Sequence, residues 1–156
     1  MRGTELLVLS AEEVRRRSLI VWNGIPAGAM SWRPDPAAMS CGEMVRHVLE
    51  GEYLYMLMIR NRRSVAQDNS PFASRPFTTV ADEVAFAHPY RGEFMSLISS
   101  IEPDALTSVT IDRSDVGYKR KLGDFILRIA YHESVHCGQM LGYLRTLGVE
   151  RPWIWD

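Results

Sequence analysis

The stretch KLGDFILRIAYHESVHCGQMLGYLRTL at residues 121–147 repeats apolar residues every three or four positions, which is the spacing of an amphipathic helix. Gly148 and then Pro152 follow it, the usual order at the end of a helix. We therefore predict a long final helix over residues 121–147. Inside it, His132 and His136 are four residues apart, so their Cβ atoms lie roughly 5–6 Å apart on one face. Both rings can then reach one metal ion.

Two earlier segments carry the sequence signature of a helix N-terminus. Ser10 and Ser40 each precede a glutamate by three residues, which is a capping-box pattern. The first predicted helix runs from Ser10 to near Pro26, and the second runs from Ser40 to about Asn61.

The middle of the chain is predicted to hold a broken third helix between two irregular connections. Thr79 can cap a short helix, Pro89 suits the first turn of another piece, and apolar periodicity continues to Ile101. Residues 62–78 contain two prolines and several small polar residues, so we expect a long exposed crossover. Residues 108–111 alternate polar and apolar side chains briefly and could form an extended segment, but residues 104–120 are expected to be loop.

Length and composition indicate one domain. At 156 residues and 46% hydrophobic, the chain can bury a core, and no break in composition argues for two units. No segment alternates convincingly as a β-strand. We therefore expect an all-α chain, a four-helix bundle with a long crossover connection, in a single domain over residues 1–156.

The histidines fall on the apolar sides of two predicted helices. His132 and His136 share their stripe with apolar residues of the last helix, Leu122, Phe125, Ile129, Met140, Tyr143 and Leu147. His47 shares the stripe of the second helix with Met44, Leu54 and Met58. All three rings are therefore expected to point into the bundle. An unpaired buried polar ring costs about 1–3 kcal/mol, so three of them require a partner.

A divalent ion would satisfy all three imidazoles at once. Three protein ligands with an open coordination position are typical of a catalytic rather than a structural zinc site. Gly51, one turn after His47, costs about 1 kcal/mol of helix propensity, which close helix approach or space beside the ion would offset. Two alternatives remain open: His47 could be a core histidine bonded to a backbone carbonyl, and the other two could lie on a wet helix surface.

Four short motifs carry a resemblance to a known family. They are WRP at residues 32–34, SCGEMVRH at 40–47, HESVHCGQ at 132–139 and LRTLG at 144–148. In this order and spacing the chain resembles the DinB/YfiT-like metal-binding family over nearly its whole length.

The resemblance implies a four-helix bundle in which His47, His132 and His136 hold a divalent metal, zinc or nickel, at one end. It also implies a homodimer. Characterised relatives include thiol-dependent transferases and isomerases that use mycothiol, bacillithiol or glutathione, so a low-molecular-weight thiol is the implied co-substrate.

A competing motif overlaps the histidine pair. The run His132-Glu133-x-x-His136 matches the H-E-x-x-H of zinc proteases, whose glutamate is a general base. No histidine follows His136, and His47 explains a third ligand better. Glu133 is therefore only a weak catalytic candidate, which could instead orient an imidazole or pack against a neighbouring helix. Gln139 is the other weak candidate, which could contact substrate, a metal-bound water or a facing helix.

The two cysteines are expected to be reduced thiols, because two distant cysteines do not build a disulfide framework. Cys137 is expected to be a small buried residue. Cys41 would lie in the first turn of a helix, where the dipole can lower the pKa of a thiol. His88, before a proline, is expected to be exposed. The apolar tail at residues 153–156 is expected to be covered by the bundle or by a second subunit.

The charge balance argues against nucleic-acid partners. Eighteen basic and nineteen acidic residues leave a formal charge of -1, which gives no overall attraction to phosphate or to anionic membranes. The basic run at residues 15–17 is expected to be a solvated helix face. No stretch approaches the ~20 apolar residues that would span a bilayer, so we expect a cytoplasmic protein.

These observations favour a metalloenzyme that acts on a small-molecule substrate. The resemblance favours metal-dependent transfer of a small thiol. A metal-dependent hydrolase that uses metal-bound hydroxide is one alternative. A non-catalytic, stress-associated metal- or ligand-binding bundle is the other.

Overall fold

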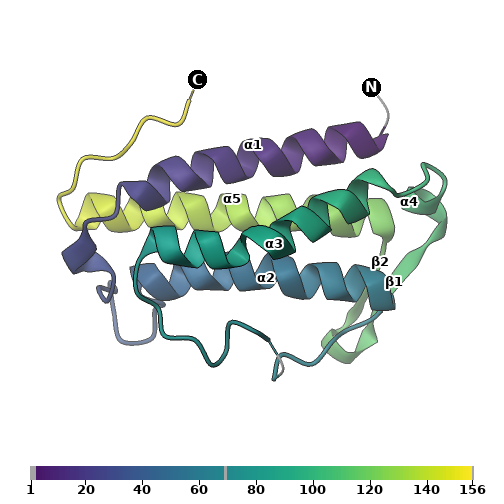
Figure 1. The fold of residues 1–156 in the computed structure, drawn as a ribbon, viewed down its shortest axis with the longest axis horizontal. Coiled ribbons are helices and arrows are strands. Elements are labelled where there is room, and N and C mark those ends of the chain that lie inside the picture. The colour runs from purple at the N-terminus through teal and green to yellow at the C-terminus, as the bar shows by residue number, and fades with distance from the viewer. Residues whose placement is uncertain (1–2, 69, 156) are drawn as a thin grey trace.

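The computed structural model describes residues 3–68 and 70–155, so the expected domain bounds at residues 1 and 156 lie outside it. The chain is mostly helical. Four long helices lie side by side (Figure 1): α1 (Gly3–Asn23), α2 (Cys41–Asn61), α3 (Val80–Ser99) and α5 (Leu122–Thr146). The shorter elements are η1 (Ala27–Ala29), α4 (Ala105–Ser108), β1 (Thr110–Arg113), η2 (Ser114–Val116) and β2 (Tyr118–Lys121).

The long helices run in two opposite pairs. In Figure 1, α1 and α5 run in one direction, and α2 and α3 run in the opposite direction. The connection from the end of α2 to the start of α3 therefore returns along the length of the molecule; the structure describes it at residues 62–68 and 70–79. Arg46 of α2 fixes this connection. Its guanidinium donates to Arg75 O at 2.6 Å and to both carboxylate oxygens of Glu83 on α3. Although most of the connection is exposed, as expected, Phe72 is fully buried against Tyr53 and Phe86.

The core consists of two groups of buried side chains. One surrounds Trp22, Val45 and Met140, and the other surrounds Phe94 and Phe125. Both groups draw on α1, α2, α3 and α5. The packing therefore fixes the relative positions of α2 and α5, which carry the three histidines.

Helix α1 begins earlier than its sequence pattern predicts. It starts at Gly3, and Ser10 lies inside it rather than at its cap. Leu7, upstream of the expected start, is buried in the core, so burial extends the helix through this first segment. The glutamate of the apparent capping box, Glu13, instead bonds to Arg16 and Arg17.

The N-termini of α2 and α3 agree with the sequence. Ser40 and Glu43 form the predicted reciprocal capping box, with Glu43 N donating to Ser40 Oγ at 3.2 Å, and α2 ends at Asn61. Thr79 caps α3 by accepting a hydrogen bond from Asp82 N at 3.1 Å. Helix α5 begins and ends within one residue of its predicted bounds.

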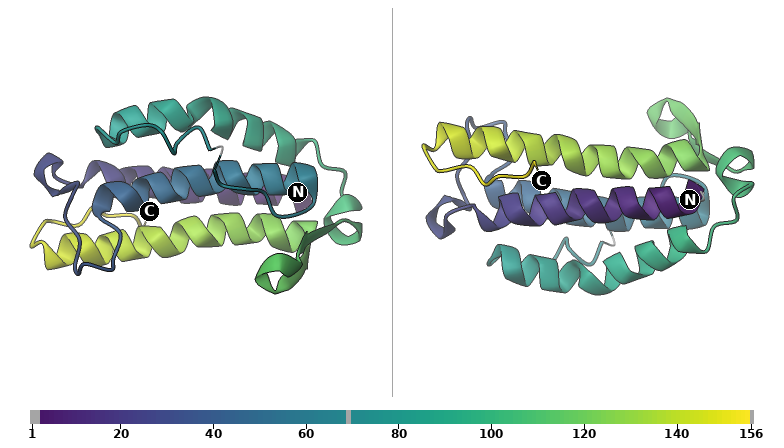
Figure 2. Two further views of the ribbon diagram at one scale, coloured as in Figure 1. Left: turned by 90° about the horizontal axis from the view of Figure 1, so that it is seen from below. Right: turned by 90° about the horizontal axis from the view of Figure 1, so that it is seen from above.

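The predicted break in the third helix is wrong. Helix α3 continues through Pro89 from Val80 to Ser99 and is curved (Figure 2). Ala87, Phe94 and Ile98 are buried along it. Core packing on both sides of the proline therefore offsets the lost backbone hydrogen bond.

Residues 104–120 are not simply loop, and the chain is therefore not all-helical. After the single turn of α4, β1 and β2 pair antiparallel, with Thr110 opposite Lys121 and Arg113 opposite Tyr118. Ile111 is fully buried and anchors the hairpin. Asp112 N donates to Arg62 O at 2.9 Å, which ties the hairpin to the end of α2.

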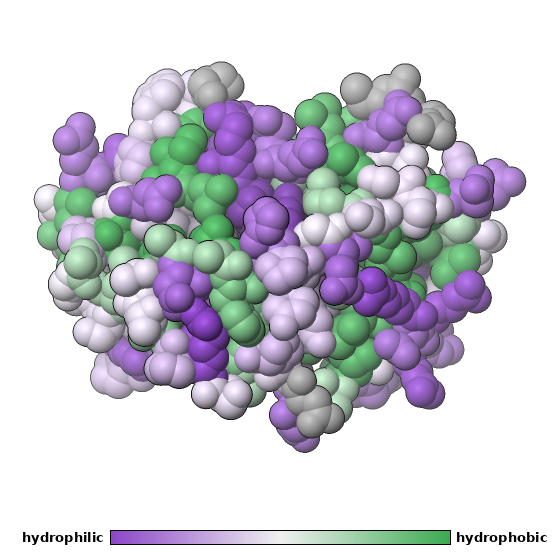
Figure 3. Space-filling view, viewed as in Figure 1, coloured by the Kyte–Doolittle hydropathy of each residue, from purple (hydrophilic) through white to green (hydrophobic). Residues whose placement is uncertain are grey.

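On the face drawn in Figure 3, hydrophobic residues are interspersed with hydrophilic ones. Within residues 3–68 and 70–155, none of the helices combines the length and apolar character required to cross a bilayer.

Candidate metal centre

The structure brings the three predicted histidines together across the α2–α5 contact. His47 Nε2 lies 3.0 Å from His132 Nε2, and His136 Nε2 lies 3.1 Å from the same atom. Their potential ligand atoms all lie within 4.8 Å of one another, and no carboxylate or thiol among the described residues joins the group. The cluster could hold a metal ion.

The cluster does not lie at the end of the helices that the resemblance implies. Ten residues separate His132 from the start of α5 at Leu122, and ten separate His136 from its end at Thr146. Gly51 of α2 faces the cluster, and a Cβ built there would lie 3.3 Å from His132 Cε1. Gly51 therefore leaves space beside the His132 ring, in agreement with its predicted role one turn after His47.

The imidazoles are less buried than their apolar stripes predict. His47 is exposed, and His132 and His136 are half-buried. The buried face of α5 instead passes through Glu133 and Cys137, each one residue further along the chain. The expectation that the rings point into the core is therefore wrong. The side chains flank the core and open onto a groove.

Gln139 holds one of the imidazoles. Its Oε1 lies 2.6 Å from His136 Nδ1. Because an amide oxygen can only accept, Nδ1 carries the proton and Nε2 keeps a lone pair for a cation. Gln139 thus orients a candidate metal ligand, His136, instead of reaching a facing helix.

The two nitrogen–nitrogen distances that involve His132 are compatible with one divalent ion. With bonds of about 2.0–2.1 Å, two imidazole nitrogens on one ion lie about 2.9 Å apart at a right angle and about 3.3 Å apart at the tetrahedral angle. The two observed Nε2 distances fall between these values. One proton can form a linear hydrogen bond in only one of the two nitrogen pairs, His47–His132 or His136–His132. A metal ion can bind all three nitrogens at once.

Burial and neighbouring charges favour the neutral form of two of the imidazoles, His132 and His47. Burial lowers the pKa of His132 to about 4, and the positive charges of His136, His47 and Arg128 act in the same direction. Packing around the imidazole and the charge of His136 lower the pKa of His47, although Glu50 opposes this shift. Neutral imidazole is the form that binds a metal.

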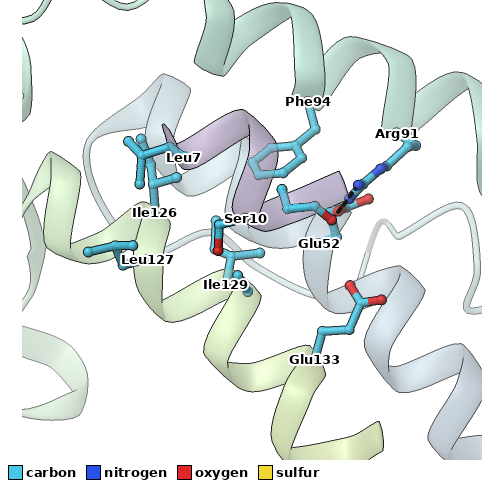
Figure 4. Close-up of a pocket in the computed structure, with 11 residues that line it drawn as sticks. Leu7, Ser10, Glu52, Arg91, Phe94, Ile126, Leu127, Ile129 and Glu133 are labelled. Carbon is cyan, nitrogen blue, oxygen red and sulfur yellow. Dashed lines mark hydrogen bonds and ion pairs between the residues drawn. The ribbon is translucent and has the colours of Figure 1, made fainter. Parts of the chain in front are cut away.

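Glu133 does not belong to this cluster. It lies in the interior, where Arg15 Nε donates to its Oε1 at 2.7 Å and Arg15 Nη2 donates to its Oε2 at 3.1 Å. The same guanidinium lies 3.4 Å from Glu52, which also pairs with Arg91. Figure 4 shows Arg91 pointing to Glu52, with the carboxylate of Glu133 turned toward the same part of the interior.

We call these four residues the interior ion-pair layer: Arg15, Glu52, Arg91 and Glu133. Each of the four long helices contributes one of them. The expectation that residues 15–17 form a solvated face is therefore wrong for Arg15, which is only 8% exposed. Glu133 therefore holds helices together through ion pairs. It is not available as the general base that a zinc-protease mechanism would require.

A groove of about 160 Å³ extends from the histidines along α2. His47, His132, Glu50 and Gly51 lie at one end, and the remaining lining residues are Leu54, Tyr55, Met58, Gln67 and Arg113. Sequence reasoning missed the two charged residues of this groove. Glu50 could have been found from its place one helical turn after His47. Arg113 could not, because it depends on the hairpin.

The remaining candidates lie away from the groove. Cys137 is buried, as predicted. Cys41 is also buried, and burial raises the pKa of its thiol, contrary to the expected effect of the helix dipole. His88 is exposed, as predicted. In the tail, Ile154 packs on the core while Trp153 and Trp155 are more than 70% exposed.

Comparison with known proteins identifies a family, a relative in sequence and a similar solved structure. The model of the DinB superfamily matches residues 10–140. The uncharacterized protein YjoA of Bacillus subtilis (strain 168) is 25% identical over 119 residues, which cover 76% of this chain and 73% of that protein. The crystal structure of a DinB-like protein, YjoA from Bacillus subtilis, superimposes with a TM-score of 0.72 over 97% of this chain and 98% of that chain. At 21% sequence identity, this last match shows the fold alone.

Proposed function

The chain belongs to the DinB superfamily, and on that premise we propose a metalloenzyme that transfers a small thiol to an electrophile. His47, His132 and His136 would hold one divalent ion, zinc or nickel. The observation that carries the proposal is the convergence of three imidazole Nε2 atoms, with His47 and His132 lining a groove. A structural zinc site is normally closed by a fourth protein ligand, and none of the described residues supplies one.

Three residues of the groove, together with Gln139 beside it, have a role in this proposal. When bound, a divalent ion would lower the pKa of a nearby thiol toward neutrality. Glu50, which has no ion-pair partner among the described residues, would accept the proton as the thiol S–H bond breaks. Sulfur would then bond to the electrophilic carbon, and the leaving group on that carbon would depart with the electron pair of the bond it loses. Gln139 would hold the ring of His136, and Leu54 and Met58 would line the apolar part of the substrate site.

We also propose a single four-helix bundle domain with a long crossover, working as a cytoplasmic homodimer. Large exposed apolar side chains on α1, α5 and the tail support the dimer: Leu6, Leu9, Leu127, Tyr131, Val135, Trp153 and Trp155. Helices α1 and α5 lie next to each other in both views of Figure 2. Deleting residues 153–156 should weaken the dimer, and an unchanged oligomeric state and melting temperature would contradict a role for the tail.

Titration of cobalt-substituted protein with glutathione, bacillithiol and mycothiol tests the reaction class. At least one thiol should change the visible spectrum of the metal, and the same thiol should be consumed by an electrophile only when metal is present. Silence across all three would contradict thiol transfer. Ester hydrolysis by the zinc form would then favour the hydrolase alternative. A large loss of thermal stability on chelation, with neither reaction, would favour a non-catalytic bundle.

A further inference from the structure

Arg113 places a positive charge in the groove and has no anionic partner among the described residues. It lies on β1 and is half-buried. Its Nε donates to Ser64 Oγ at 3.0 Å, and its Nη1 donates to the Tyr118 hydroxyl at 2.9 Å. Both partners are neutral, and none of the described residues accepts a hydrogen bond from Nη2. The Ser64 hydroxyl in turn donates to Asp115 Oδ1 at 2.6 Å, so the nearest carboxylate in this chain of hydrogen bonds reaches Arg113 only through a serine. The side chain is held in place without a direct ion pair.

This arrangement differs from the other arginines that the fold covers. Arg15, Arg46 and Arg91 each pair with a buried glutamate. A guanidinium that loses part of its hydration is costly unless an anion compensates it. The chain supplies that anion at these three sites but not at Arg113 or at Arg128, which is also half-buried, and of these five arginines only Arg113 lines the groove.

The surroundings of Arg113 add further positive charge. The guanidinium carbons of Arg113, Arg120 and Arg128 lie 5.4, 5.4 and 5.2 Å from the centre of the Tyr118 ring. Within the described residues, only Arg120 has a carboxylate partner, Asp124. The Nε atoms of Arg120 and Arg128 are buried without a hydrogen-bond partner. Arg128 therefore adds a second positive charge without a carboxylate partner beside Tyr118, although it is not itself a lining residue of the groove.

The two ends of the groove differ in charge and lie apart along α2. His47 and Met58 both line it, and eleven residues of helix span about 16 Å. Glu50 lies one turn from His47, whereas Arg113 is tied to Ser64, just beyond the C-terminal end of α2. A ligand that reaches both the histidines and Arg113 must therefore be extended.

We infer that Arg113 binds an anionic group, most simply a carboxylate, of a small extended molecule whose other end lies at the three histidines. This inference rests on the proposed function and sharpens it. The transferred thiol carries a carboxylate separated from its sulfur by a chain of several atoms, and Arg113 selects it over a neutral thiol of the same length.

A series of synthetic thiols tests this directly. Cobalt-substituted protein is titrated with ω-mercaptocarboxylates of three to eight carbons, each compared with the mercaptoalcohol of equal length. At the length that spans the groove, the carboxylate should bind roughly ten- to hundredfold more tightly, as expected for a hydrogen bond between charged groups. Arg113→Gln should remove this preference, while Arg145→Gln, which removes the same charge from an exposed position of α5, should keep it.

The outcomes separate the inference from the proposed function. Equal binding of carboxylate and alcohol at every length, or a preference that survives Arg113→Gln, would overturn the inference and leave thiol transfer intact. If no thiol changes the cobalt spectrum, thiol transfer fails, and calorimetric titration with glutarate decides the inference alone. Binding that Arg113→Gln abolishes supports it, whereas no binding, or binding that this substitution leaves unchanged, overturns it.

Discussion

His132 and Glu133 are consecutive residues, yet they belong to two regions that treat charge in opposite ways. In the interior ion-pair layer, Glu133 and Glu52 are matched by Arg15 and Arg91, so every charge has a partner from another helix. At the groove, three imidazoles converge, and one proton cannot bridge both of their Nε2 contacts. Arg113 and Glu50, which line the groove, have no ion-pair partner among the described residues. Charged side chains that form ion pairs within the protein hold the helices together. Charged side chains without such a partner are available to bind a ligand.

The largest expected effect comes from breaking the interior layer. Glu133→Gln removes the anion that accepts two hydrogen bonds from Arg15, which leaves a buried guanidinium short of charge. The free energy of unfolding should fall by about 3–5 kcal/mol in urea denaturation. The matched control is the preceding residue. His132→Gln should cost the metal-free protein less than about 1 kcal/mol, and equal losses in both variants would erase the distinction between the regions.

A pH titration of the metal-free protein probes the groove side. The pKa of His132 is about 4 in the folded chain and about 6.5 when unfolded. The unfolded chain therefore takes up the proton first. The contribution of neutral His132 is fully present above pH 6.5 and is lost as pH falls toward 4, by at most about 3 kcal/mol. Relative to His132→Gln, which has no imidazole to titrate, wild type should lose stability over this range until it is the less stable of the two, and a constant difference would contradict the lowered pKa.

Loss of the hydrogen bond behind the cluster should weaken metal binding without removing it. Gln139→Leu frees the Nδ1 proton of His136, so the ring can rotate away from the shared ion. The Kd for zinc should rise roughly 10–100-fold in competition with a chelating dye. Gln67→Leu, at a groove glutamine without a described contact to the histidines, should leave the Kd unchanged.

The smallest effect is expected at Gly51. Alanine favours the helix by about 1 kcal/mol, so Gly51→Ala should raise the stability of the metal-free protein by up to that amount. The added Cβ would lie 3.3 Å from His132 Cε1, which forces a small shift of the ring. We expect zinc affinity to fall roughly two- to fivefold. Gly92→Ala, which meets no atom within 4 Å, should stabilise the chain with no change in affinity.

Sequence patterns sufficed where local chemistry decides the structure. The capping box at Ser40, the cap at Thr79 and the bounds of α5 all follow from side chains that bond to their own helix ends. The convergence of the three histidines also follows, because an i, i+4 pair and one residue of another helix need only two helices in contact.

Tertiary packing decided the features that the sequence did not predict. Core contacts carry α3 through Pro89, and burial of Leu7 extends α1 upstream of Ser10. On α5, the buried face contains Glu133 rather than the histidines. Burial of this carboxylate is possible because Arg15, from a segment distant in sequence, neutralises it. Arg113 enters the groove only through the hairpin, and its strands are too short to show a clear alternation.

Metal content of the purified protein tests the central claim most directly. After dialysis against excess zinc and then buffer, wild type should retain about one zinc ion per chain by elemental analysis. His47→Ala, His132→Ala and His136→Ala should each retain far less, while Glu133→Gln, assayed where it remains folded, should retain the ion. Stoichiometric zinc that survives the loss of the histidines, or that disappears with Glu133 alone, would contradict a three-histidine site.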